Sequence, residues 1–235
     1  MNRTVIFGAG DISIEDVADL AFLQATAALT TGREFEDRIR RGTEFLDRLI
    51  NEDGVIYGVT TGFGDSCTTG IPESLVSELP HALVRFHGCG MGRMLEPALG
   101  RAVIVARIAS LCRGFSGVSL ELLQRLVTLL QHDIVPEIPE EGSVGASGDL
   151  TPLSYLAANL IGERNVIHAG RRRPASEALE DVGLTPYRLR PKEGLALMNG
   201  TAVMTALACI AYQRAEYLAR LASRLTAMCS IALKG

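Results

Sequence analysis

The sequence has no tryptophan, and its aromatic residues amount to only 5% of 235 positions. A chain of this length can bury a sizeable core. Because 47% of the residues are hydrophobic but few are aromatic, that core must consist mainly of leucine, alanine, valine and isoleucine. Such a composition favours helices. We therefore expect a globular, mainly α-helical protein.

Cysteine is sparse as well, and it follows no metal-binding pattern. The five cysteines include no Cys-x-x-Cys pair, which argues against a zinc site and against a disulfide framework. Free thiols are typical of a reducing compartment. The N-terminus lacks the apolar segment of a signal peptide, and no stretch approaches the roughly 18 apolar residues of a membrane span. These absences predict a cytoplasmic protein with no metal and no membrane partner.

Charge is modest, with a formal net charge of −4. The one notable basic run is Arg171–Arg173, and three adjacent arginines are more typical of a solvated turn than of a nucleic-acid-binding patch. No nucleic-acid partner is therefore expected.

Apolar periodicity predicts helices over residues 13–30, 33–50, 97–113, 119–131 and 201–233. Pro80 should kink or break a helical segment, and Thr151 should cap a helix that begins at Pro152. Residues 164–190 should contain a small hairpin and a short helix. The helix over 201–233 is apolar on nearly all sides, so it should be buried among other helices.

The triplet Ala146-Ser147-Gly148 carries distinctive chemistry. Gly148 has no Cβ to keep its amide nitrogen from the carbonyl carbon of Ala146, so the backbone can close a five-membered ring. Loss of water and dehydration of Ser147 then give an unsaturated imidazolone. Taken alone, the triplet also fits an ordinary glycine-rich turn before a helix. A phosphate-binding loop is a weaker alternative, because the lysine of a P-loop is absent.

Three segments together resemble the histidine, phenylalanine and tyrosine ammonia-lyases. The run from Val135 to Tyr155 resembles the signature that surrounds their Ala-Ser-Gly triplet. The glycine-rich loop Tyr57-Gly-Val-Thr-Thr-Gly-Phe-Gly64 resembles their tyrosine loop, and Lys192-Glu-Gly-Leu-Ala-Leu-Met-Asn-Gly-Thr201 resembles their asparagine segment. The resemblance covers roughly residues 50–235.

This resemblance implies a cofactor and a reaction. The cofactor is 4-methylidene-imidazol-5-one, formed autocatalytically from Ala146-Ser147-Gly148, and the reaction is elimination of ammonia from an aromatic L-amino acid to give an arylacrylate. Tyr57 matches the catalytic base; a free phenol has a pKa of about 10, so the site must lower it. Asn199 matches the asparagine beside cofactor and substrate. For Asp149 we favour a structural role, as a helix cap or as a support of the cofactor loop.

Phe86 and His87 match the pair that selects the substrate in this family. His87 is the residue type of histidine ammonia-lyases, whereas Phe86 is that of phenylalanine ammonia-lyases. The residues themselves therefore leave the choice among histidine, phenylalanine and tyrosine open.

The resemblance also implies an ammonia-lyase/aspartase-like helical fold. We expect a cofactor-bearing N-terminal domain over residues 1–195, and the first long helix of a central bundle over residues 196–235. Complete family members are tetramers of chains about twice as long, and their later segments include an arginine that binds the substrate carboxylate. We therefore expect a homo-oligomer or association with a C-terminal half, and little activity from this chain alone. A 2,3-aminomutase with the same cofactor and a catalytically incomplete fragment remain alternatives.

Overall fold

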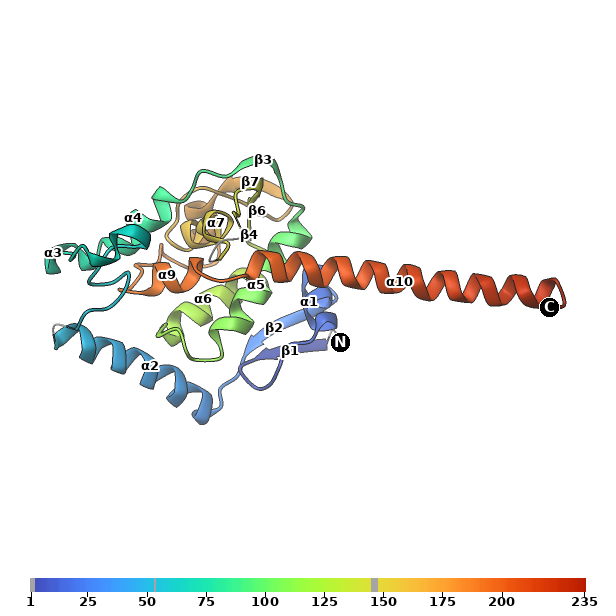
Figure 1. The fold of residues 1–235 in the computed structure, drawn as a ribbon, viewed down its shortest axis with the longest axis horizontal. Coiled ribbons are helices and arrows are strands. Elements are labelled where there is room, and N and C mark those ends of the chain that lie inside the picture. Colours follow the sequence, from blue (N-terminus) through green and yellow to red (C-terminus); the bar gives the residue numbers. More distant parts are fainter. Residues whose placement is uncertain (1–2, 53, 145–147) are drawn as a thin grey trace.

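A computed structural model describes residues 3–52, 54–144 and 148–235 of the chain. The protein is mainly helical, as predicted (Figure 1). The helices are α1 (Ile14–Ala21), α2 (Arg33–Asn51), α3 (Glu73–Val76), α4 (Leu79–Phe86), α5 (Pro97–Leu111), α6 (Leu120–Gln131), α7 (Leu150–Leu160), α8 (Ala175–Asp181), α9 (Glu193–Met198) and α10 (Ala202–Ala232), with a 3-10 turn at Gly64–Thr68. The strands are β1 (Arg3–Phe7), β2 (Ala25–Leu29), β3 (Met91–Met94), β4 (Val135–Pro136), β5 (Pro139–Glu141), β6 (Asn165–His168) and β7 (Arg171–Pro174).

Most of the predicted elements are present. Helices α2, α5, α6 and α10 confirm the predictions made from apolar periodicity. The break at Pro80 is confirmed too, because α3 ends at Val76 and α4 takes Pro80 into its first turn. Strands β6 and β7 form the antiparallel hairpin expected within residues 164–190, and α8 follows it.

The prediction of one helix over residues 13–30 was wrong in its second half. Ser13 does cap α1, with a complete capping box to Asp16, but the helix ends at Ala21 and Leu23 turns the chain with a φ of 59°. Residues 25–29 then form β2, which pairs in parallel with β1. The alanines of this segment favour a helix locally, and pairing with β1 overrides that preference.

The start of α7 also differs from the prediction. The helix begins at Leu150, so Asp149 occupies the cap position in place of Thr151. Pro152 is the third helical residue instead of the first. It still lies in the first turn, where a backbone amide has no partner inside the helix and the missing N–H of proline costs nothing.

Helix α5 forms the centre of the core. Its residues from Ala102 to Val105, together with Ile108 and Leu111, are fully buried. Helices α1, α6 and α10 all pack against it. Burying a side chain of this kind stabilises the fold by about 1.5–3 kcal/mol, so α5 fixes the positions of the surrounding helices.

Helix α10 is only partly covered. Its first turns are buried at Ala202, Val203, Ala206 and Ile210, whereas the second half of the helix projects away from the rest of the chain (Figure 1). Large apolar side chains stand exposed along this half, at Tyr217, Leu218, Leu221, Leu225, Met228 and Ile231. Within this chain, the expected burial among other helices covers only the first turns of α10.

Residues 193–232 are long and apolar enough to cross a membrane, by length and composition alone. Half of the most apolar 18-residue window is buried inside the protein. The core helix of a globular protein meets the same criteria, so the finding is weak support for a membrane span.

The five cysteines differ sharply in accessibility, which gives a test of the core. Burial raises the pKa of the Cys112 thiol to about 12, so at pH 8 this thiol is protonated and shielded. We expect a thiol reagent at pH 8 to label the exposed Cys67, Cys89 and Cys229 while Cys112 stays unmodified until the protein is denatured. Peptide mass mapping shows the order in which the cysteines are labelled. Labelling of Cys112 as fast as Cys89 in the folded protein would contradict this packing.

Candidate active site

Gly148 approaches the segment between α9 and α10 so closely that no side chain fits. Its φ is +142°, in the region that favours glycine. A Cβ built on Gly148 would lie 2.7 Å from the backbone nitrogen of Gly200 and 2.8 Å from Oδ1 of Asn199. Of the predicted cofactor triplet, Ala146 and Ser147 lie outside the described residues. The described member therefore sits directly against Asn199.

Asp149 fixes the same contact through its backbone and its side chain. The backbone N–H of Asp149 donates to the Gly200 carbonyl at 2.7 Å. Carboxylate oxygen Oδ2 accepts hydrogen bonds from the amides of Val203 and Met204, at 2.9 and 3.0 Å, and Oδ1 accepts one from the Ser143 hydroxyl at 2.9 Å. Asp149 thus stands at the cap position of α7, while its carboxylate caps α10.

The loop that carries Tyr57 is held by its own threonines. The Thr60 hydroxyl accepts from the Ile56 amide at 2.8 Å and donates to the Gly54 carbonyl at 2.9 Å. The Tyr57 hydroxyl oxygen accepts a hydrogen bond from the Gly64 amide at 3.0 Å. The Tyr57 ring is half exposed. Its position is therefore set by local hydrogen bonds, and the phenol remains accessible.

Tyr57 and Asn199 line one cavity of about 390 Å³. These residues are 142 positions apart in the chain (199 − 57), and the fold brings them together. Two cationic side chains, Arg107 and Lys192, lie in the wall of the same cavity. A phenol, an amide and two cationic groups at one cavity suit the binding of an anionic ligand and a proton transfer.

Phe86 and His87 are not among the residues that line this cavity in the described part of the chain. Phe86 is 81% exposed. His87 ends α4, where its Nδ1 lies 3.0 Å from the Leu83 carbonyl oxygen. The two rings contact each other edge to face, with their centroids 5.1 Å apart.

Arg107 is a site residue that the motifs did not reveal. It projects from α5 and is only 3% exposed. Its Nη2 donates to the Ala196 carbonyl, and its Nε has no partner among the described residues. Burial lowers the pKa of Arg107 to about 10, against an opposing effect of the Asp149 carboxylate. The guanidinium is therefore charged at neutral pH. A lone charge within the apolar segment 102–108 was the available sequence signal.

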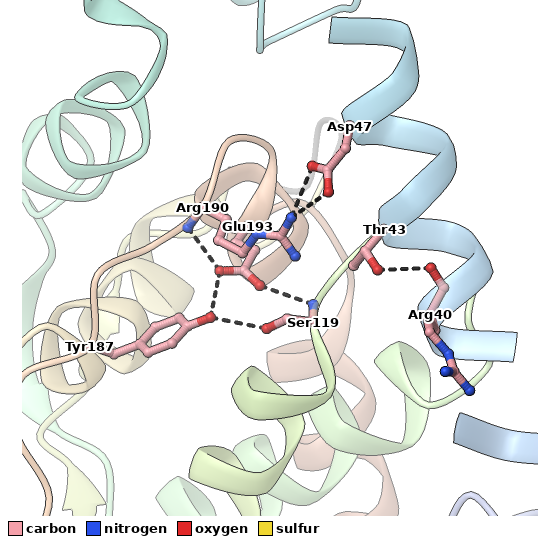
Figure 2. A network of polar contacts seen from close by, with 7 residues as sticks. All are labelled: Arg40, Thr43, Asp47, Ser119, Tyr187, Arg190 and Glu193. Atoms are coloured by element: carbon pink, nitrogen blue, oxygen red, sulfur yellow. Dashed lines mark hydrogen bonds and ion pairs between the residues drawn. The ribbon is translucent and has the colours of Figure 1, made fainter. Parts of the chain in front are cut away.

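Figure 2 shows a second buried network, centred on Glu193 at the start of α9. The fully buried Glu193 carboxylate accepts hydrogen bonds from the Ser119 amide at 3.0 Å, the Tyr187 hydroxyl at 2.9 Å and the Arg190 amide at 2.9 Å. Burial raises the pKa of Tyr187, and the nearby Glu193 carboxylate adds to this effect. Tyr187 is therefore a hydrogen-bond donor here. The network joins α9 to the start of α6.

The outer part of this network reaches α2. Arg190 donates from its Nη2 to both carboxylate oxygens of Asp47, at 2.9 and 2.7 Å (Figure 2). Lys192, between Arg190 and Glu193, has a φ of +77°, which is uncommon for a residue with a side chain. The contacts on either side hold that conformation. They place Lys192 in the cavity wall beside Tyr57 and Asn199.

Comparison with known proteins explains why these segments occur together. The family model described as aromatic amino acid lyase matches residues 12–235. The chain belongs to the aromatic amino acid lyase family. It is 42% identical over 202 residues to a histidine ammonia-lyase of Bacillus velezensis, covering 86% of this chain and 40% of that protein. It is 41% identical over 225 residues to the human histidine ammonia-lyase, covering 95% of this chain and 34% of that protein.

Solved structures of the aromatic amino acid lyase family have the same fold. A histidine ammonia-lyase from Trypanosoma cruzi matches with a TM-score of 0.88 and 34% identity, over 99% of this chain and 44% of that one. A tyrosine aminomutase from Streptomyces globisporus matches with a TM-score of 0.83 and 36% identity, over 92% of this chain and 40% of that one. The chain thus spans less than half the length of these relatives.

The Glu193 network yields a prediction about stability. Changing Glu193 to Gln replaces one acceptor oxygen with an NH2 group that faces hydrogen-bond donors, which should destabilise the fold by about 1–3 kcal/mol. Changing Tyr187 to Phe removes one donor and leaves two, so a smaller loss of about 1 kcal/mol is expected. Urea unfolding followed by circular dichroism measures both. Equal stability of the Gln variant and the wild type would mean that these three hydrogen bonds to Glu193 do not stabilise the fold.

Proposed function

We propose that the complete protein eliminates ammonia from an aromatic L-amino acid, using a 4-methylidene-imidazol-5-one ring formed from Ala146-Ser147-Gly148. The observation that carries this proposal is the meeting of three distant segments. Tyr57 and Asn199 line one cavity, and Oδ1 of Asn199 lies against Gly148. Family membership supplies the reaction class, a carbon–nitrogen lyase.

The flanks of the triplet fit the proposed ring. Ring closure requires the Gly148 nitrogen to approach a carbonyl carbon without steric hindrance, and the backbone at Gly148 tolerates no Cβ. Asp149, the residue after Gly148, makes hydrogen bonds to Gly200, Val203 and Met204. These bonds support its proposed role as the anchor of the cofactor loop. Once formed, the ring supplies an electrophilic carbon that withdraws electrons from the substrate.

The residues of this chain would supply the remaining chemistry. The accessible Tyr57 phenol is the proposed base for the β-proton; its oxygen accepts the Gly64 N–H, which holds the phenol in place at the cavity. The Asn199 amide would hydrogen-bond the ring or the substrate carboxylate. Phe86 and His87 remain the proposed substrate-selecting pair, on the resemblance alone.

L-Histidine is the first substrate to test, because the curated relatives named above are histidine ammonia-lyases. A 2,3-aminomutase is the second candidate, favoured by the structural match to a tyrosine aminomutase. Both reactions begin with the same loss of the amine. They differ in whether the amine returns to the β-carbon.

The exposed half of α10 is the proposed surface of assembly. Leu218, Leu221 and Leu225 are each between 38% and 61% exposed, and a row of apolar side chains of this kind marks an interaction surface. We propose that it packs into a helical bundle with other copies of the chain or with the remainder of the protein. The free thiols support the cytoplasm as the proposed location.

An intact mass measurement tests the cofactor. Formation of the ring removes two water molecules, so the purified chain should be lighter than its sequence by that amount. Ser147→Ala cannot lose the serine hydroxyl as water, and this variant should lack the dehydration that creates the methylidene group. A wild-type mass equal to that of the unmodified sequence would contradict the proposal for this chain.

An activity assay separates the candidate reactions. With L-histidine, L-phenylalanine or L-tyrosine, appearance of an ultraviolet-absorbing arylacrylate identifies a lyase, and a β-amino acid on chromatography identifies an aminomutase. In the complete protein, Tyr57→Phe should lower kcat by about 10²–10⁴-fold, the usual contribution of a positioned base. Loss of less than about tenfold would exclude Tyr57 from that role. A folded preparation that forms neither product would instead support a catalytically incomplete fragment.

A further inference from the structure

A break between two helices presents Asn199 to Gly148. Helix α9 ends at Met198 and α10 begins at Ala202. The residues on both sides of the break include strong helix formers, but Asn199, Gly200 and Thr201 within it all have low helix propensity. Together they weaken the helix by only about 2 kcal/mol. The geometry of the break is therefore set by contacts with other parts of the chain.

Opposite charges stand at the two helix ends that flank this break. The Asp149 carboxylate accepts the first free amides of α10, from Val203 and Met204. The Arg107 guanidinium donates to Ala196, whose carbonyl belongs to the last turn of α9. A negative group at a helix N-terminus and a positive group at a helix C-terminus are each favourable. Both would lose their partners if α9 and α10 joined into one helix.

Arg107 also occupies the space beneath the break. A Cβ built on Gly200 would lie 2.0 Å from Nη1 of Arg107, so the guanidinium packs against the bare Cα of Gly200. The backbone of Gly200 also contacts Gly148 and Asp149. The segment carrying Asn199 is thus in contact with both α5 and the residues that follow the cofactor loop.

We propose that Arg107 is a positioning residue of the active site, which holds the α9–α10 break open and keeps Asn199 beside Gly148. The charge on Arg107 is opposed across the break by Asp149, and none of the ion pairs among the described residues includes Arg107. A cation so deeply buried is costly unless hydrogen bonds and opposite charge offset its lost hydration, and here the Ala196 carbonyl and the Asp149 carboxylate do so. That this site is a lyase active site rests on the proposed function, whereas the role of Arg107 in holding the α9–α10 break open does not.

Arg101 provides a matched control on the same helix. Its side chain is only 12% exposed, and it donates to Asp133 at 2.6 Å and to the Ala21 carbonyl at 2.8 Å. It lines neither of the cavities that Arg107 lines. Replacing Arg101 should destabilise the fold without acting on the break.

Amide hydrogen exchange tests the proposal. In Arg107→Met, we expect the amides of Asp149 and Val203 to exchange about tenfold faster or more, relative to Leu126 in α6, because a hydrogen bond to a charged group is lost. Arg107→Lys should restore part of the protection, since it keeps the charge but not the planar fork. Arg101→Met should leave the ratio of these exchange rates unchanged.

The exchange ratios decide whether Arg107 positions the break. Equal exchange ratios in Arg107→Met and Arg101→Met would overturn the proposal, and so would a ratio in Arg107→Met equal to that of the wild type. The intact masses of the same samples report ring formation separately. An unmodified wild-type mass together with faster exchange in Arg107→Met would reject the proposed cofactor and support the positioning role of Arg107.

A double substitution gives a second, independent measurement. Gly200→Ala should lower Tm in the wild-type background, because the new methyl group meets Arg107. In the Arg107→Met background the same change should lower Tm less, since a flexible thioether can move aside. Additive losses in Tm would show that Arg107 does not pack against Gly200.

Discussion

Two segments of the chain that are 54 residues apart meet at the carboxylate of Asp149. This buried group has to satisfy its oxygens, and it does so with the amides at the start of α10 and with the Ser143 hydroxyl. A buried carboxylate without such partners would be strongly unfavourable. The requirement therefore locks the loop that ends at Gly148 onto the start of α10, and the neighbouring contacts of Gly148, Asn199 and Gly200 follow from it.

The remainder of the domain acts as a rigid support for that contact. Helix α5 is buried throughout residues 102–108, and α1, α6 and α10 all pack against it. Glu193 ties α9 to the start of α6, and Arg190 ties it to α2. These contacts fix both ends of the segment that carries Asn199. The site is thus assembled from loops. Buried polar groups anchor the loops that carry Gly148 and Asn199 to helices, whereas hydrogen bonds within the loop hold Tyr57.

Local pattern in the sequence predicted the helices well, because periodicity of 3.6 residues records which face is buried. It failed at Ala25–Leu29, because this segment becomes a strand only by pairing with β1, 22 residues earlier in the chain. It also placed the cap of α7 at Thr151, whereas the helix begins at Leu150 and Asp149, which the sequence offered as a possible helix cap, occupies that position. Contacts between distant segments leave no mark in a short window of sequence.

The residues of the candidate site were less predictable from local sequence pattern than the helices were. Tyr57, Gly148, Asp149 and Asn199 were found through resemblance to a family, and no spacing between residues 57 and 199 would have placed them at one cavity. Arg107 carried a weak local signal, as a charge in an apolar helix, but its partners are a carbonyl and a glycine that sequence does not point to. The Glu193 network was missed for the same reason. Its donors are mostly backbone amides, which every residue type supplies.

The cap at Asp149 has a consequence for the far end of α10 as well. A helix is stiff over several turns, so the direction and rotation set at Val203 and Met204 are transmitted to Leu218, Leu225 and beyond. The side chains at the start of α10 face α5, and those further along are presented to solvent at angles determined by that same start. If the exposed half of α10 joins a bundle as proposed, its register with the partner helices depends on the carboxylate that also anchors the cofactor loop. Assembly and site geometry would then be coupled through one rigid helix, and a substitution at Asp149 would disturb both.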